Sequence, residues 1–125
     1  MHAVGEELRS GRKRTHWMWF VFPQLAALGM SAMAKRFGIS SLDEARAYLA
    51  HAVLGPRLRE CCALLLGVNG RSIEEILGHP DDLKFRSCLT LFLQAAPSEA
   101  VFSQCLVKYY GGVPDPRTMA LCSKP

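Results

Sequence analysis

The 125-residue sequence lacks the short motifs that would assign it to a common class of enzyme. It contains no glycine-rich dinucleotide loop, no Walker phosphate loop, no His-Glu-x-x-His zinc motif and no Gly-x-Ser-x-Gly nucleophile turn. Its five cysteines are an odd number, two of them are adjacent, and none lies at Cys-x-x-Cys spacing. This pattern argues against a disulfide framework and a structural zinc site, so we expect neither a metal nor a cofactor.

Long apolar runs and secretion signals are also lacking. The stretch Phe20–Leu28 is far too short to span a bilayer, and no signal-peptide pattern precedes the first polar residues. The cysteines lie mostly among aliphatic residues, where a free thiol acts as a small apolar side chain. We therefore predict a cytoplasmic protein that has no contact with membranes.

Excess positive charge is confined to the N-terminal third. The net charge is +4, and the six bases and two acids of residues 1–36 account for all of it. Four of these bases, Arg9, Arg12, Lys13 and Arg14, precede an aromatic segment. Basic residues beside aromatic ones can bind single-stranded nucleic acid, but no zinc-finger or recognition-helix motif accompanies them. We therefore rank nucleic-acid binding below binding of a small anion, and the oligomeric state stays open.

Alternating strand patterns are scarce, whereas helix start and stop signals recur along the chain. Ser41–Glu44 and Ser72–Glu75 are capping boxes, Pro56 suits a first helical position, and Gly111 suits a left-handed C-cap. We predict one compact all-α domain over residues 1–125, a bundle of about six to eight short helices. The predicted helices are Ala3–Arg9, His16–Phe22, Ser31–Phe37, one after Ser41, Arg57–Gly67, one after Ser72, one from Asp81 or Asp82 to about Ala96, Glu99–Tyr110 with Ser98 as candidate cap, and a short one from Asp115-Pro116.

The segment Lys13–Gln24, which reads KRTHWMWFVFPQ, is the densest aromatic stretch of the chain. It holds four of the eleven aromatic residues within twelve positions. Such a segment either anchors a core or forms the wall of a ligand pocket. Polar residues at both of its ends favour testing the second interpretation.

The longest predicted helix carries a polar stripe beside its apolar face. Lys84, Ser87, Thr90 and Gln94 recur at spacings of three, three and four residues, so they share one side of the helix. One interpretation is a solvated face on which Asp81 pairs with Lys84. The other is that the Lys84 ammonium and the two hydroxyls converge on a phosphate or carboxylate, which needs hydrogen-bond donors.

Together, the aromatic segment and the polar stripe define a candidate site. His16 and Asp82 are the candidate catalytic residues, because an imidazole and a carboxylate can transfer protons. Each candidate also has a structural interpretation, such as a hydrogen-bonded core histidine or a carboxylate at a helix N-terminus. The predicted ligand-binding residues are Lys13, Trp17, Trp19, Gln24, Lys84, Ser87 and Thr90.

Two motifs, HWMWFVFPQL at residues 16–25 and PDDLKFRSCLTLF at residues 80–92, strongly resemble a bacterial family known as domain of unknown function 1810. Shorter similarities extend the resemblance over nearly the whole chain. It implies a compact, mainly helical domain with no established activity, and it assigns no catalytic role. The family is sometimes labelled calpastatin. We reject that label, because calpain inhibitors of that name are long, polar and disordered until bound.

This chain departs from the family pattern at its start. Members usually begin with an additional helical stretch before the position of Ala3, so the sequence is expected to lack one N-terminal helix. In addition, Ala52 stands where proline is usual, and Cys88 stands where a small polar residue is common.

Three hypotheses for function remain. The first is a domain that binds a small anionic or planar metabolite between the Trp17 segment and the Lys84 helix, with catalysis left open. The alternative is a structural or protein-interaction module without a small-molecule site, in which the same residues are core and its hydrogen-bonded surroundings. The third is weak binding of single-stranded nucleic acid through the basic N-terminal cluster.

Overall fold

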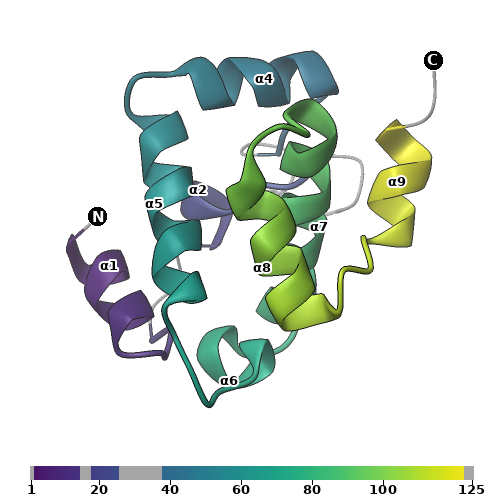
Figure 1. Cartoon of the computed structure of the whole chain (residues 1–125). Helices are drawn as coiled ribbons and strands as arrows, with labels where there is room; N and C mark the ends of the chain where they lie inside the picture. Colours follow the sequence, from purple (N-terminus) through teal and green to yellow (C-terminus); the bar gives the residue numbers. More distant parts are fainter. Residues whose placement is uncertain (1, 15–17, 26–37, 123–125) are drawn as a thin grey trace.

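The computed structural model describes residues 2–14, 18–25 and 38–122, and every regular element in these ranges is a helix (Figure 1). The prediction of an all-α fold is therefore confirmed. The predicted helix over Ser31–Phe37 and the first residues of the one over His16–Phe22 lie outside the described residues. The helices are α1 (His2–Arg9), α2 (Met18–Val21), α4 (Leu42–Ala50), α5 (Leu54–Leu66), α6 (Ile73–Leu77), α7 (Asp81–Ala95), α8 (Ala100–Tyr110) and α9 (Pro116–Cys122).

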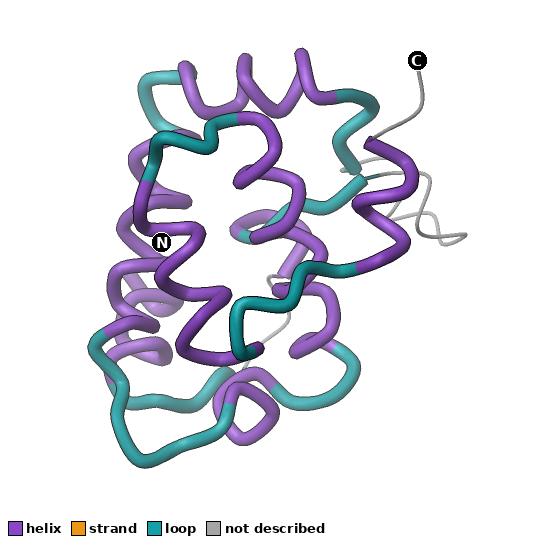
Figure 2. The backbone as a smooth tube through the Cα atoms, turned by 45° about the vertical axis from the view of Figure 1, so that its right-hand side comes forward, coloured by secondary structure: helices purple, strands orange, loops and turns teal. Residues whose placement is uncertain are grey.

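Helix α7 is the central element of the fold. At 15 residues it is the longest described helix, and it packs against α2, α4, α6, α8 and α9, while α1 packs against α5 (Figure 1). Its residues Ser87–Phe92 are all buried, so the middle of the helix is covered on every side. Figure 2 shows loops joining the successive helices from α4 to α9. None of these helices is long and apolar enough to cross a membrane.

Serine caps set two of the helix starts, as the sequence predicts. Ser72 Oγ accepts from the N–H of Glu75 at 3.1 Å, and the Glu75 carboxylate accepts from the N–H of Ser72 at 2.9 Å. This capping box is complete. Ser41 Oγ likewise accepts from the N–H of Glu44 at 3.1 Å, but the Glu44 carboxylate accepts from the hydroxyl of Ser40. The box at Ser41 is therefore only half formed.

Ser72→Ala should lower the free energy of unfolding by about 1 kcal/mol, because it removes the oxygen that accepts from a first-turn amide of α6. Urea unfolding followed by circular dichroism measures the change. Ser103→Ala is the matched control, since the Ser103 hydroxyl donates only to the carbonyl of Ala100 in α8, and its effect should stay below about 0.5 kcal/mol. Equal losses in the two variants would contradict the capping role.

Helices α5 and α8 differ from their predicted starts. Helix α5 starts at Leu54, three residues before the predicted start, and therefore contains Pro56 in its first turn. Proline is tolerated there, because the amides of the first turn have no intrahelical acceptor. Helix α8 begins at Ala100 with Glu99 as its N-cap residue, so Ser98 does not have the predicted capping role. The Glu99 carboxylate pairs with Arg59 of α5, with Nε and Oε1 2.5 Å apart, which ties the start of α8 to another helix.

Two glycines are required by the local geometry. A Cβ atom at Gly55 would lie 2.1 Å from the carbonyl oxygen of Leu49, so only glycine allows α5 to start this close to the end of α4. Gly111 ends α8 with φ at 63°, and its N–H donates to the carbonyl of Leu106. The predicted left-handed C-cap is therefore confirmed.

Two segments distant in sequence are fixed against α7. The ring of Phe22 meets that of Phe85 with their centroids 4.6 Å apart, which anchors the segment after α2. The backbone N–H of Asp115 donates to Thr90 Oγ1 at 2.9 Å, which holds the start of α9. These two contacts hold the residues around Gln24 and those around Asp115 against α7.

The cysteines serve the core. All five are free thiols, and four of them are buried. Burial raises the pKa of Cys61 to about 11 and raises the pKa values of Cys62 and Cys88 above their ordinary value. These thiols stay protonated at neutral pH and pack as small apolar side chains.

Candidate functional site

A pocket of about 260 Å³ lies where the segment after α2, the first turns of α7 and the start of α9 meet. It brings together three of the residues predicted to bind a ligand, namely Gln24, Lys84 and Ser87. These three come from the two segments that the sequence analysis combined. The full lining is Gln24, Pro80, Leu83, Lys84, Ser87, Asp115 and Arg117.

Lys13, Asp81 and Lys84 form an ion-pair network at the edge of this pocket. The Lys13 ammonium lies 2.9 Å from Asp81 Oδ2, and the Lys84 ammonium lies 3.6 Å from Asp81 Oδ1. The pairing of Lys84 with Asp81 confirms the predicted i,i+3 contact. The Lys13 side chain is 8% exposed and that of Lys84 is 34% exposed. One carboxylate thus serves two ammonium groups, and one of these, that of Lys84, belongs to a residue that lines the pocket.

Gln24 contributes a buried amide to the same pocket. The residue is only 6% exposed, and its backbone carbonyl accepts from the N–H of Ile39 at 2.9 Å. The described part of the chain provides no hydrogen-bond partner for its side-chain amide, which borders the pocket. An amide side chain has two donor hydrogens and an acceptor oxygen, which suit a ligand or water in the pocket.

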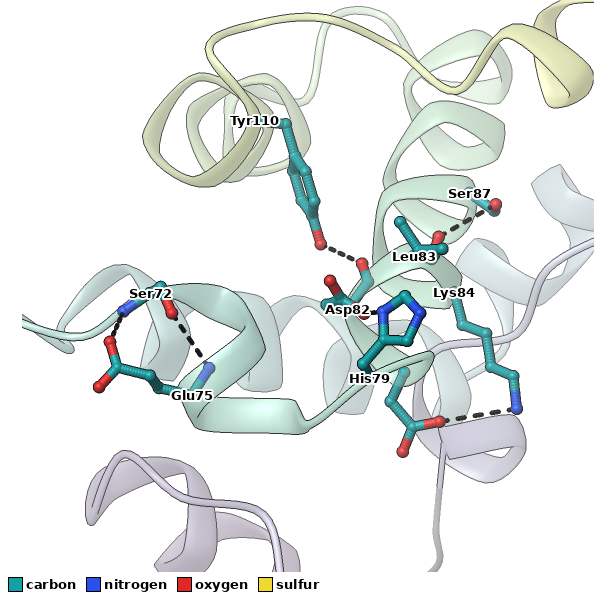
Figure 3. A network of polar contacts seen from close by, with 9 residues as sticks. Ser72, Glu75, His79, Asp82, Leu83, Lys84, Ser87 and Tyr110 are labelled. Atoms are coloured by element: carbon teal, nitrogen blue, oxygen red, sulfur yellow. Dashed lines mark hydrogen bonds and ion pairs between the residues drawn. The ribbon is translucent and has the colours of Figure 1, made fainter.

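The two predicted hydroxyls have different positions. Ser87 lines the pocket, and its hydroxyl donates to the carbonyl of Leu83 at 3.2 Å, as Figure 3 shows. Its lone pairs still face outward, and rotation of the hydroxyl makes it a donor. Thr90 is completely buried and does not line the pocket. It donates to the carbonyl of Arg86 at 2.8 Å and accepts from the N–H of Asp115, so its role is to place Asp115.

Asp115 and Arg117 are pocket residues that sequence reasoning missed. Asp115 Oδ2 accepts from the N–H and the hydroxyl of Thr118 at 2.9 and 2.7 Å, so the carboxylate caps α9. Arg117 is exposed, and the residues that the structure describes offer its guanidinium no ion-pair partner. The Asp-Pro start of α9 was visible in the sequence, but the return of α9 to α7 depends on the tertiary contact with Thr90.

Several predicted site residues lie outside the described part of the chain. The structure does not describe His16 or Trp17, and of Trp19 it describes only the backbone, which is part of α2. Their proposed roles in proton transfer and in stacking stay predictions.

Residues 1–122 match the model of a family described as a protein of unknown function, DUF1810. The chain belongs to the DUF1810 family. A similar solved structure is the crystal structure, at 1.38 Å, of the conserved hypothetical protein Rv1873 from Mycobacterium tuberculosis. Its sequence is 60% identical to that of this DUF1810 chain, and the two structures match with a TM-score of 0.97. That match covers 99% of this chain and 89% of the mycobacterial one. No curated protein matches the chain. The resemblance found in the sequence is confirmed, and neither description names an activity or a ligand.

This DUF1810 protein has a second pocket, of about 520 Å³, on the other side of the first turn of α7. Asp82 lines this larger pocket, so the structure does not bring it together with Lys84 and Ser87. The hydroxyl of Tyr110 donates to the backbone carbonyl of Asp82 (Figure 3). The pocket is lined by Val68, Asn69, Gly70, Arg71, Ser72, Ile73, Glu74, Asp82, Leu83, Lys108, Tyr109 and Tyr110.

His79 is the partner of the candidate acid Asp82. Its Nδ1 lies 2.9 Å from Asp82 Oδ1, a contact that the sequence analysis missed although the two residues are three apart at the start of α7 (Figure 3). A carboxylate at this nitrogen orients the imidazole. Among the described residues of this DUF1810 protein, no group of three His, Cys, Asp or Glu side chains is placed to hold a metal ion.

Proposed function

We propose that the chain binds a small anionic compound in the pocket between α7 and α9. The observation that carries this proposal is the meeting of two cationic side chains, Lys84 and Arg117, from separate helices in one pocket. The buried amide of Gln24 and the hydroxyl of Ser87 add donors of the kind that bind phosphate or carboxylate oxygens.

The charge balance favours an anion over a neutral ligand. The lining carries the positive charge of Lys84, whose carboxylate partner Asp81 is shared with Lys13. Arg117 adds a second positive charge, while Asp115 is the one acidic residue of the lining. The carboxylate of Asp115 suits a hydroxyl or amine donor of the same ligand.

The size of the pocket restricts what it holds. Pockets for drug-sized ligands measure about 300–1,000 Å³. At about 260 Å³ this pocket accommodates one phosphate or carboxylate group with a few adjoining atoms. Because the candidate acid Asp82 lines the other pocket, the proposal is one of binding.

A second candidate function is a structural or protein-interaction module. The nearly buried Lys13–Asp81 pair and the hydrogen-bonded Thr90 favour it, because both have roles within the fold that need no ligand. On this alternative Lys84→Ala changes nothing beyond the loss of its contact with Asp81.

Inorganic phosphate should raise the melting temperature of the protein, and Arg117→Gln should weaken that binding about tenfold or more. One charge-assisted hydrogen bond contributes about 1.5–3 kcal/mol, and every 1.4 kcal/mol is a tenfold change in affinity. Thermal shift against increasing phosphate, at constant ionic strength set with chloride, measures both affinities.

Arg12→Gln is the matched control, because Arg12 is an exposed arginine that lines neither pocket. It should bind phosphate as the wild type does. If phosphate leaves the wild-type melting temperature unchanged, or if both variants lose the same affinity, the proposed site is wrong.

A further inference from the structure

Leu83 forms a ridge between the two pockets. Leu83 lines both of them, and the residue is 49% exposed. Successive residues on a helix are rotated by about 100°, so its neighbours Asp82 and Lys84 point to opposite sides of it. Figure 3 shows Tyr110 on one side of Leu83 and Lys84 with Ser87 on the other.

The larger pocket has a fixed aromatic wall. The hydroxyl of Tyr109 donates to the carbonyl of Leu65 at 2.5 Å, and that of Tyr110 donates to the carbonyl of Asp82. The ammonium of Lys108 lies 5.3 Å from the centre of the Tyr109 ring and donates to the carbonyl of Leu66 at 2.7 Å. Both rings are therefore held in place before any ligand arrives, as a wall that receives a planar group requires.

We infer that a single ligand occupies both pockets and crosses Leu83. Its phosphate lies between Lys84 and Arg117, its middle part covers Leu83, and a planar ring lies against Tyr109 and Tyr110. A phosphorylated compound with a planar heterocycle, such as a nucleoside monophosphate, has this chemistry. The inference rests on the proposed function, because it takes the phosphate position from there.

The dimensions support a compound of this length. A ligand that joins the pockets must cross one turn of α7, and a helix with its side chains is about 10 Å wide. Phosphate alone fills only the smaller pocket of about 260 Å³. The larger pocket of about 520 Å³ has room for a heterocycle, and the side chain of Asp82 offers acceptors to its N–H groups.

The test compares inorganic phosphate with adenosine, guanosine, cytidine and uridine 5′-monophosphates by isothermal titration calorimetry. At least one nucleotide should bind the wild type about tenfold or more tightly than phosphate, since burial of a leucine and a ring adds to the phosphate contacts. Leu83→Ala should weaken that nucleotide about tenfold and weaken phosphate much less, because a leucine side chain offers a phosphate no hydrogen-bond donor. Arg117→Gln should weaken both.

Val107→Ala is the matched control, because Val107 is an aliphatic residue that is 64% exposed and lines neither pocket. Circular dichroism checks that each variant is folded, and alanine at an exposed helix position keeps the helix. If phosphate binds but no nucleotide binds more tightly, or if Leu83→Ala leaves the ratio of nucleotide to phosphate affinity unchanged, the bridging ligand is overturned and the anion pocket stands. If the wild type binds neither phosphate nor any nucleotide, the proposed function itself fails.

Discussion

Phe85→Ala should lower the free energy of unfolding by about 4 kcal/mol and the melting temperature by about 10 °C or more. Phe85 is completely buried at the start of the central helix. Its ring meets those of Phe22, at 4.6 Å, and Tyr110, at 6.3 Å, between centroids. Removal of the ring leaves a cavity between α2, α7 and α8, which the surrounding side chains fill only in part. Urea unfolding measures the loss.

Phe85→Leu separates the cavity from the loss of aromatic contacts. It keeps most of the apolar volume, so we expect a loss of about 1–1.5 kcal/mol. Because Phe22 anchors the segment that carries Gln24, Phe85→Ala should also weaken phosphate binding, whereas Phe85→Leu should preserve it. A loss below about 1 kcal/mol for the alanine variant would show that Phe85 is not central to the core.

Features that depend on neighbouring residues were predictable from the sequence. The capping box of Ser72 and Glu75 and the C-cap at Gly111 follow from residues within one turn, and the structure has both. The start of α8 was not predictable in this way, because Glu99 pairs with Arg59 of α5. A helix end that is set by a partner far along the chain has no local signal.

The candidate site shows the same division. The polar stripe of α7 correctly grouped Lys84 with Ser87, since the period of a helix fixes that spacing. It also included Thr90, which is buried because the start of α9 returns to this face and donates to its hydroxyl. The same return brings Arg117 to the pocket. Such contacts depend on the path of the whole chain, which a pattern of spacing does not contain.

Asp81→Ala should lower the free energy of unfolding by about 3 kcal/mol, whereas Lys84→Ala should lower it by less than about 1 kcal/mol. The Lys13 side chain is 8% exposed, so loss of the carboxylate 2.9 Å away removes a counter-charge from a nearly buried ammonium. Lys84 is 34% exposed and lies 3.6 Å from the same carboxylate, where water replaces the lost contact. Urea unfolding of the two variants measures the difference.

The same two variants distinguish a structural from a ligand-binding role for Lys84. If Lys84 binds the anion, Lys84→Ala should keep its stability and lose most of its affinity for phosphate. Asp81→Ala should do the opposite. Removal of the carboxylate lowers stability, but it also removes a negative charge that competes with the ligand for the ammonium of Lys84. Phosphate should therefore bind at least as tightly as in the wild type. Asp81→Asn is the control that keeps the size of the side chain and one acceptor oxygen but removes its charge. If Lys84 has only a structural role, Lys84→Ala should lose no more than its contact with Asp81 and leave phosphate affinity unchanged, and the anion pocket would then have to depend on Arg117 alone.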